Sequence, residues 1–250
     1  MERRSSKFTS FDGVELAIHE MGQGRPLLLL HGLFSDAHMN WIKFGHAEKL
    51  ADAGFHVVMP DLRAHGQSDA PHDPKAYPKD VLVKDISAII DSFGWDEFDL
   101  GGFSLGARTT AKLLATGTCP RKAILAGMGL EGLSGWLQRR NFFFTAIDKR
   151  NSAKRGDRHW MAIQFMKSQK IDPIAARFLL GTFTDMETAD LAEIDVPTLV
   201  LCGSNDRDNG SPEKLAAALP DGRHVAIPGN HMSSVTRPEL AVAIKMFLKS

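Results

Sequence analysis

Short apolar runs alternate along this chain with longer stretches in which apolar residues recur at helical spacing. The runs have the length and continuous apolarity of strands covered on both faces, at residues 26–31, 55–61, 98–103, 122–128, 197–202 and 224–227. Helical spacing fills stretches between and after them, at residues 41–53, 78–93, 105–116, 212–219 and 237–248. The chain opens on a predicted hairpin, residues 7–11 and 14–20, around an Asp12-Gly13 turn. This alternation predicts an α/β protein with a mostly parallel central sheet flanked by helices.

The alternation is interrupted once, between the run at 122–128 and the run at 197–202. Residues 131–190 carry helical periodicities, many aromatic and methionine side chains, and no convincing strand. A helical segment placed between two strands of a parallel sheet makes a cap over that sheet and not an independent domain. We therefore expect one domain over residues 1–250, with a helical cap at about 131–190 between the sixth and seventh strands. We refer to residues 131–190 as the helical insertion.

Composition narrows the class of protein without indicating a reaction. The 250 residues are 43% apolar and 24% charged, which are ordinary values for a globular chain able to bury a large core. Thirty basic side chains balance thirty acidic ones, so no overall field favours nucleic acid or an anionic membrane. We therefore expect no nucleic-acid partner.

Targeting and thiol signals point to a cytoplasmic protein. The strongest apolar run, residues 27–30, is far below the roughly 20 residues that a membrane span requires. Residues 1–10 are polar and lack the apolar core of a secretory signal. Cys119 and Cys202 make neither a disulfide framework nor a CxxC pair. We expect a cytoplasmic location and no membrane span.

The clearest chemical signal lies at residues 100–106, of sequence LGGFSLG. It contains G-x-S-x-G between a predicted strand and a predicted helix, which is the setting of a nucleophile elbow. On such a sharp turn Ser104 projects its hydroxyl above the sheet, and strand and helix approach so closely that Gly102 and Gly106 are required. The alternative is an ordinary glycine-serine turn, but the setting favours Ser104 as a nucleophile.

A serine hydroxyl needs a base and an orienting acid, and in this arrangement they follow in the order Asp or Glu, then His. His231 lies in the loop after the last predicted strand, and an imidazole pKa near 6.5 suits a general base. Asp206 comes three residues after Gly203, which ends the preceding strand, and Asp208 is the alternative acid. Asp206 is expected to hold the tautomer of His231.

Two backbone N–H groups are candidates for an oxyanion hole. One belongs to Leu105, the residue after the predicted nucleophile. The other belongs to Leu33, in a loop that follows a buried strand and in which Gly32 lets the backbone turn inward.

These segments resemble the α/β-hydrolase superfamily, and the resemblance covers essentially the whole chain. Four blocks carry it: His31-Gly32-Leu33-Phe34, Asp61-Leu62-Arg63-Ala64-His65-Gly66-Gln67-Ser68, Gly102-Phe103-Ser104-Leu105-Gly106 and Gly229-Asn230-His231. Ala107 and Asn230 stand where many relatives have glycine. The resemblance implies that the block at 61–68 is a structural loop without chemistry.

The resemblance also narrows the reaction. Haloalkane dehalogenases and epoxide hydrolases of this fold use an aspartate nucleophile, and Ser104 argues against both. Tyr77, the only tyrosine, precedes the helical insertion, so the tyrosine pair of epoxide-hydrolase caps is missing. Acyl chemistry remains, and we expect a serine hydrolase that cleaves carboxylic esters. An acyltransferase or perhydrolase, a C–C bond hydrolase and a non-turnover ligand receptor of this fold remain alternatives.

The helical insertion offers candidates for substrate selection. Its aromatic and methionine residues either line an apolar acyl or aromatic pocket or pack the insertion onto the core: Trp136, Phe142, Phe143, Phe144, Trp160, Met161, Phe165 and Met166. A basic stretch either attracts an anionic substrate or membrane surface or forms a solvated helix face: Arg139, Arg140, Lys149, Arg150, Lys154, Arg155 and Arg158, against Asp148 and Asp157. The packing and solvated interpretations are favoured.

No cofactor or metal is indicated. The histidines lack HExxH or H-x-H spacing, and no G-x-x-x-x-G-K-[ST] loop is present. Gly22-Gln23-Gly24 opens no dinucleotide-binding helix. The expected partner is a small ester with an apolar acyl or aromatic group, and its identity, the acyl length and the oligomeric state are not fixed by the sequence.

Overall fold

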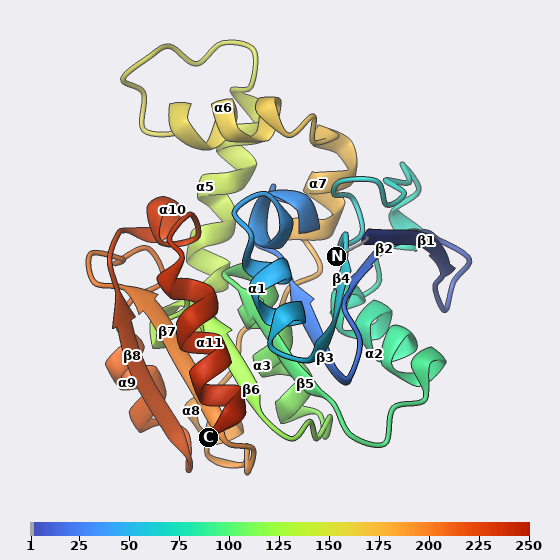
Figure 1. Ribbon diagram of the computed structural model, residues 1–250. Helices are drawn as coiled ribbons and strands as arrows, with labels where there is room; N and C mark the ends of the chain where they lie inside the picture. The colour runs from blue at the N-terminus through green and yellow to red at the C-terminus, as the bar shows by residue number, and fades with distance from the viewer. Residues whose placement is uncertain (1–2) are drawn as a thin grey trace.

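The eight strands of the computed structural model, which describes residues 3–250, form one sheet in the order β1-β2-β4-β3-β5-β6-β7-β8 (Figure 1). Their bounds are β1 Arg3–Thr9, β2 Glu15–Met21, β3 Arg25–Leu30, β4 Phe55–Pro60, β5 Asp99–Phe103, β6 Ala123–Ala126, β7 Thr198–Gly203 and β8 Gly222–Ile227. β2 is antiparallel to both of its neighbours, and every other pair is parallel. The predicted hairpin and mostly parallel sheet are confirmed; Met1 and Glu2, the start of the polar N-terminal stretch, lie outside the described residues.

Helices cover both faces of this sheet, which explains why inner strands such as β3 and β7 are almost continuously apolar. Their bounds are η1 His38–Ile42, α1 His46–Asp52, η2 Pro74–Ala76, α2 Val81–Phe93, α3 Leu105–Ala115, α9 Pro212–Ala217, α10 His231–Ser234 and α11 Glu239–Lys249. In β3, Leu27 and Leu29 pack in one core cluster with residues of α1 and α11, whereas Leu28 and Leu30 pack in another with residues of α2 and α3. Both sets are fully buried.

The helix predicted at residues 41–53 is wrong as a single element. The structure has a π-helical turn, η1, then a break, and then α1. Gly45 takes a left-handed backbone with φ of 72°, which ends the first turn and restarts the chain in a new direction. The side chain of Trp41, in η1, is fully buried in the core cluster that contains residues of α1 and α11, and this burial favours the early turn.

The helical insertion contains α4 Leu130–Ser134, α5 Trp136–Asp148, α6 Trp160–Ser168, α7 Pro173–Leu180 and α8 Thr188–Ala192. All of residues 131–190 are described and none is in a strand, which confirms helices between the sixth and seventh strands. In Figure 1, α5 rises from the end of the sheet, α6 lies farthest out and α7 returns toward the core. None of the helices in residues 3–250 has the length and apolarity to cross a bilayer.

The packing interpretation of the aromatic and methionine residues holds for five of the eight, because Phe143, Phe144 and Phe165 are partly buried against the core that contains Trp136 and Met166. Trp136 is 5% exposed and Met166 is fully buried, and both belong to the core cluster that includes α2 and α3. Met161, by contrast, exposes 71% of its surface to solvent. The helical insertion therefore shares one apolar core with the sheet.

Candidate active site

Ser104 occupies a strained turn between β5 and α3. Its backbone has φ of 53° and ψ of −107°, a combination that costs a non-glycine residue about 1–3 kcal/mol. The turn is held from both sides, because the Ser104 N–H donates to the Ala126 carbonyl at 2.8 Å and its carbonyl accepts the Arg108 N–H at 2.9 Å. The strain is thus fixed by the sheet on one side and by the helix on the other.

The predicted crowding at the two glycines of the motif is confirmed. A Cβ added at Gly102 would lie 2.2 Å from the backbone of Gly106, and one added at Gly106 would lie 2.2 Å from the carbonyl oxygen of Leu30. Backbone atoms cannot yield as a flexible side chain does, so any larger residue displaces α3 from the sheet. The glycines therefore allow α3 to begin directly behind Ser104.

Ser104, His231 and Asp206 form a continuous chain of hydrogen bonds. His231 Nε2 lies 3.0 Å from Ser104 Oγ, and His231 Nδ1 lies 2.8 Å from Asp206 Oδ2. Because a carboxylate only accepts, Nδ1 donates its hydrogen to Asp206 and Nε2 is left to accept the hydroxyl hydrogen of Ser104. This geometry suits proton transfer from the serine to the imidazole.

The loops after β7 and β8 place the acid and the imidazole. Asp206 is 3% exposed, and its second carboxylate oxygen accepts the N–H of Asp208 at 3.1 Å. Asp208 is exposed, and of the two acids only Asp206 is hydrogen-bonded to His231 among the described residues. Asn230 caps the short helix α10, accepting the Ser233 N–H at 2.9 Å, and thereby fixes the residue just before the imidazole.

The two predicted oxyanion donors belong to the residue after the serine and to the residue after Gly32, which lies close to the serine. Leu105 follows Ser104 directly, and a Cβ added at Gly32, the residue before Leu33, would lie 3.5 Å from the Ser104 Cβ. Across residues 3–250, neither the Leu33 N–H nor the Leu105 N–H donates a hydrogen bond to a protein group. Both amides are therefore available to a developing negative charge.

Two buried histidines, whose role the sequence did not reveal, hold the loop that carries Leu33. His31 Nδ1 donates to the Gly32 carbonyl at 2.8 Å, and its Nε2 accepts the Leu62 N–H at 2.8 Å. His65 Nε2 accepts the N–H of Phe34 at 3.0 Å. Phe34 has φ of 59°, so this hydrogen bond helps to stabilise an otherwise unfavourable backbone. The block at 61–68 thus supports the loop that carries a candidate oxyanion donor.

The acid stability of the fold is expected to depend on His65. Burial lowers the pKa of the His65 imidazole from about 6.5, its value in the unfolded chain, to about 3 in the folded protein. Between these two pH values only the unfolded chain binds a proton on this imidazole. Stability is complete above about pH 6.5 and falls by about 1.4 kcal/mol per unit as the pH drops toward 3. Urea unfolding at about pH 7.5 and pH 5 measures this loss, and His65→Gln, which keeps an acceptor, should reduce it by about 2 kcal/mol. Equal pH slopes in both proteins would contradict the assignment.

The helical insertion reaches the acid loop through Arg139. Its guanidinium donates to Asn209 Oδ1, and Asn209 Nδ2 donates to the Gly127 carbonyl at 2.7 Å. Burial lowers the pKa of Arg139, and the nearby carboxylates of Asp208 and Asp206 counteract that change. This contact ties α5 to the segment that carries the predicted acid.

One group of side chains in the described part of the chain has the proximity that a metal site requires. Ligand atoms of Asp206, Asp208 and His231 lie within 4.8 Å of one another. Asp206 and His231 are already hydrogen-bonded to each other, and an ion bound there would replace the contact that orients the imidazole. The expectation of no metal and no cofactor stays a prediction.

Residues 25–154 match the family model described as alpha/beta hydrolase fold. Epoxide hydrolase 2 of Siraitia grosvenorii is 31% identical over 110 residues, covering 43% of this chain but only 33% of that protein. Non-heme chloroperoxidase CPO-A1 of Kitasatospora aureofaciens is 25% identical over 230 residues, and the match covers 80% of each chain. A thermophilic esterase from Thermogutta terrifontis has a TM-score of 0.76 at 24% identity over 98% of both chains, a likeness that shows the fold alone.

Proposed function

The chain belongs to the α/β-hydrolase fold family, and on that basis we propose that it is a serine hydrolase that cleaves carboxylic esters. The observation that carries the proposal is the hydrogen-bonded chain from Ser104 through His231 to Asp206. It begins at a serine held in a strained turn, which a merely structural serine does not require. We also propose that residues 1–250 act as one domain with the helical insertion as its cap.

The proposed reaction proceeds through an acyl-enzyme. Ser104 Oγ attacks the ester carbonyl as His231 Nε2 takes its proton, and Asp206 stabilises the imidazolium that forms. Collapse of the tetrahedral intermediate expels the alcohol, which receives the proton from His231. Water then attacks the acyl-serine with the same imidazole as base, releasing the acid and restoring the Ser104 hydroxyl.

Leu33 and Leu105 supply the backbone donors for the oxyanion in this proposal. Their support is that both N–H groups lack a partner among the described residues, that Leu105 follows Ser104 directly and that Gly32, before Leu33, lies close to the Ser104 side chain. Each such donor contributes about 3–4 kcal/mol of transition-state stabilisation. The hydrogen bonds of His31 and His65 keep the Leu33 loop in place before substrate binds, so the donors need no rearrangement.

An apolar acyl or aromatic group is the proposed substrate feature. Phe34 of the oxyanion loop contacts Phe143 of α5, with ring centroids 5.9 Å apart, and Phe143 stacks on Trp136 at 5.8 Å. Trp136 contacts Phe183 at 5.0 Å. We call these four residues the aromatic wall. It connects the helical insertion to the residue next to Leu33, and Phe143, its one partly buried member, has surface left for an apolar group.

The reaction of the epoxide-hydrolase relative is not proposed for this chain. That match covers only 43% of the chain. The proposed nucleophile is Ser104, and the proposed acid and base are Asp206 and His231. Attack of a serine hydroxyl on an epoxide would leave an ether, which water and an imidazole do not cleave. Acyl transfer to Ser104 leaves an ester, which they do.

Active-site labelling and burst kinetics test the proposed function. A short p-nitrophenyl ester in excess over the enzyme should release a burst of about one p-nitrophenol per chain when deacylation is slower than acylation. A fluorophosphonate should block turnover and be found on the peptide that contains Ser104. Ester turnover that persists after stoichiometric labelling of Ser104, or a label found on another residue, would overturn the proposal.

Perhydrolysis is the second candidate, because the chloroperoxidase relative aligns with 80% of this chain. Hydrogen peroxide would replace water in the second step, converting the acyl-serine to a peracid and free serine. With acetic acid as the acyl donor, Ser104 would first take the acetyl group with release of water, so adding hydrogen peroxide and acetate should give peracid at a rate that falls with fluorophosphonate labelling of Ser104. Ester hydrolysis without any enzyme-dependent peracid would exclude this second activity.

A further inference from the structure

Arg108 is a buried cation on the helix that begins behind the proposed nucleophile. It lies one turn after Ser104, is 6% exposed, and stacks its guanidinium 5.6 Å from the Trp136 ring centroid. Its Nη1 donates to the carbonyls of Gly132 and Leu133 at 2.6 and 3.0 Å. These carbonyls belong to α4, where the helical insertion leaves the sheet.

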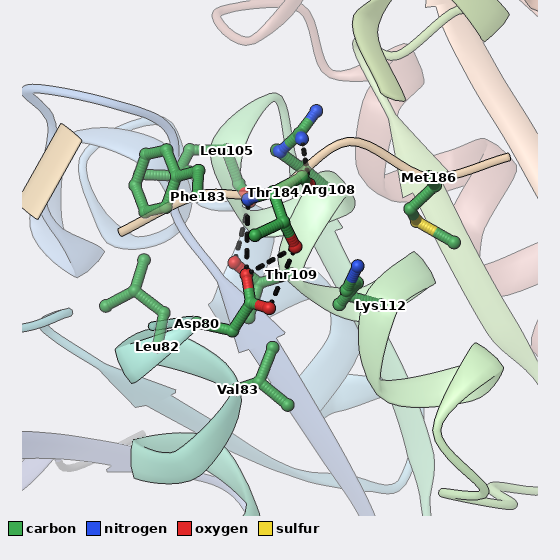
Figure 2. Close-up of a pocket in the computed structure, with 10 residues that line it drawn as sticks. All are labelled: Asp80, Leu82, Val83, Leu105, Arg108, Thr109, Lys112, Phe183, Thr184 and Met186. Atoms are coloured by element: carbon green, nitrogen blue, oxygen red, sulfur yellow. Dashed lines mark hydrogen bonds between the residues drawn. The ribbon is translucent and has the colours of Figure 1, made fainter. Parts of the chain in front are cut away.

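The same guanidinium also binds the returning end of the insertion. Its Nη2 donates to the Thr184 carbonyl and lies 3.4 Å from Asp185 Oδ1. Figure 2 shows Thr184 between Arg108 and Asp80, whose carboxylate accepts the Thr184 hydroxyl at 2.8 Å. One side chain on α3 therefore contacts both the outgoing and the returning segments.

Asp185 also binds the backbone at the start of α5. Its carboxylate accepts the N–H of Trp136 at 2.6 Å and lies 3.5 Å from that of Leu137, at the first turn of α5. Trp136 Nε1 in turn donates to the Leu180 carbonyl at 3.2 Å. The Arg108–Asp185 pair thus fixes where the helix that carries Trp136 and Phe143 begins.

The cavity beside this pair is not a substrate pocket. It measures about 20 Å³ and is lined by Leu105, Arg108, Phe183 and Thr184 among others, and Ser104, Asp206 and His231 do not line it (Figure 2). That volume holds about one water. Among the described residues the Arg108 guanidinium hydrogen-bonds to the helical insertion and to no side chain of Ser104, Asp206 or His231, so any effect on the site passes through its contacts with the insertion.

We propose that Arg108 is a positioning residue that, with Asp185, holds the aromatic wall against the oxyanion loop and so determines the acyl groups that the site accepts. This inference rests on the proposed ester-hydrolase function. The guanidinium links the first turn of the nucleophile helix, both ends of the helical insertion and the Trp136 ring in one set of contacts. No other side chain in residues 3–250 hydrogen-bonds to both of those ends and also stacks on the wall.

The test compares kcat/KM for p-nitrophenyl acetate, butyrate and octanoate in wild type and Arg108→Met. The ratio between two esters does not depend on how much of the variant is folded, so a merely structural role leaves it unchanged. A loosened wall should flatten the profile, lowering the ratio of best to worst ester by about tenfold. Arg121→Met, which removes an exposed arginine that lies 3.9 Å from Glu97, is the matched control and should keep the wild-type profile.

Two further variants test the role of Arg108 independently of Arg108→Met. Should Arg108→Met not fold, Asp185→Asn, which retains an acceptor for Trp136, should flatten the profile in the same direction, and Arg108→Lys should restore part of it. Hydrogen exchange should be faster at the start of α5 in the flattened variants. A wild-type profile in folded Arg108→Met and Asp185→Asn would overturn the role of Arg108 alone, whereas ester turnover insensitive to Ser104 labelling would overturn the proposed function as well.

Discussion

Replacing Ser104 with alanine is expected to lower kcat for a short p-nitrophenyl ester by roughly 10⁶-fold. The loss is that large because alanine removes the proposed nucleophile, and the proposed base His231 and acid Asp206 then have no hydroxyl to activate. The free backbone amides of Leu33 and Leu105 should leave a residual rate of roughly 10³-fold over the uncatalysed reaction. Steady-state hydrolysis with purified variants measures the change.

Two variants separate this result from a loss of folding. Ser6→Ala changes an exposed serine of β1 and should keep wild-type turnover. Ser104→Gly should be as inactive as Ser104→Ala yet more stable by about 1 kcal/mol, because glycine adopts the φ of 53° without strain. A folded Ser104→Ala protein with turnover within about tenfold of wild type would place the nucleophile elsewhere.

The sheet was predictable because its inner parallel strands, such as β3, β5, β6 and β7, are buried on both faces along most of their length. Leu27 to Leu30 are all fully buried, so the run is apolar at every position and its strand character is evident from sequence. The break between η1 and α1 was not predictable in the same way. Apolar spacing continues across Gly45, and only its left-handed backbone ends the helix.

Some residues of the candidate site could likewise be predicted from the sequence, and others could not. Ser104, Asp206 and His231 each follow a strand end, and strand ends of a parallel sheet converge, so their order and spacing were enough to group them. His65 and Arg108 carry no such signal. Their partners lie 31 positions away at Phe34 and 77 positions away at Asp185, and which buried polar groups meet is decided only by packing.

Replacing Asp206 with asparagine is expected to lower kcat by roughly 10⁴-fold while leaving the fold intact. The reason is the tautomer of His231. In the native chain Asp206 accepts the Nδ1 hydrogen, which leaves Nε2 free to accept from Ser104. The amide introduced by Asp206→Asn has hydrogens to donate to Nδ1, which places the imidazole hydrogen on Nε2, where it faces the serine and cannot remove its proton.

Asp208→Asn is the matched control for this prediction, because Asp208 lies two residues away and is exposed while Asp206 is buried. The Asp208 carboxylate makes no hydrogen bond to His231 in the described part of the chain, so its replacement should change kcat by less than about threefold. Measurement of kcat for both variants between about pH 6 and pH 9 distinguishes the two carboxylates. A loss in Asp208→Asn equal to that in Asp206→Asn would mean that charge near the imidazole, and not the hydrogen bond to Nδ1, supports the reaction.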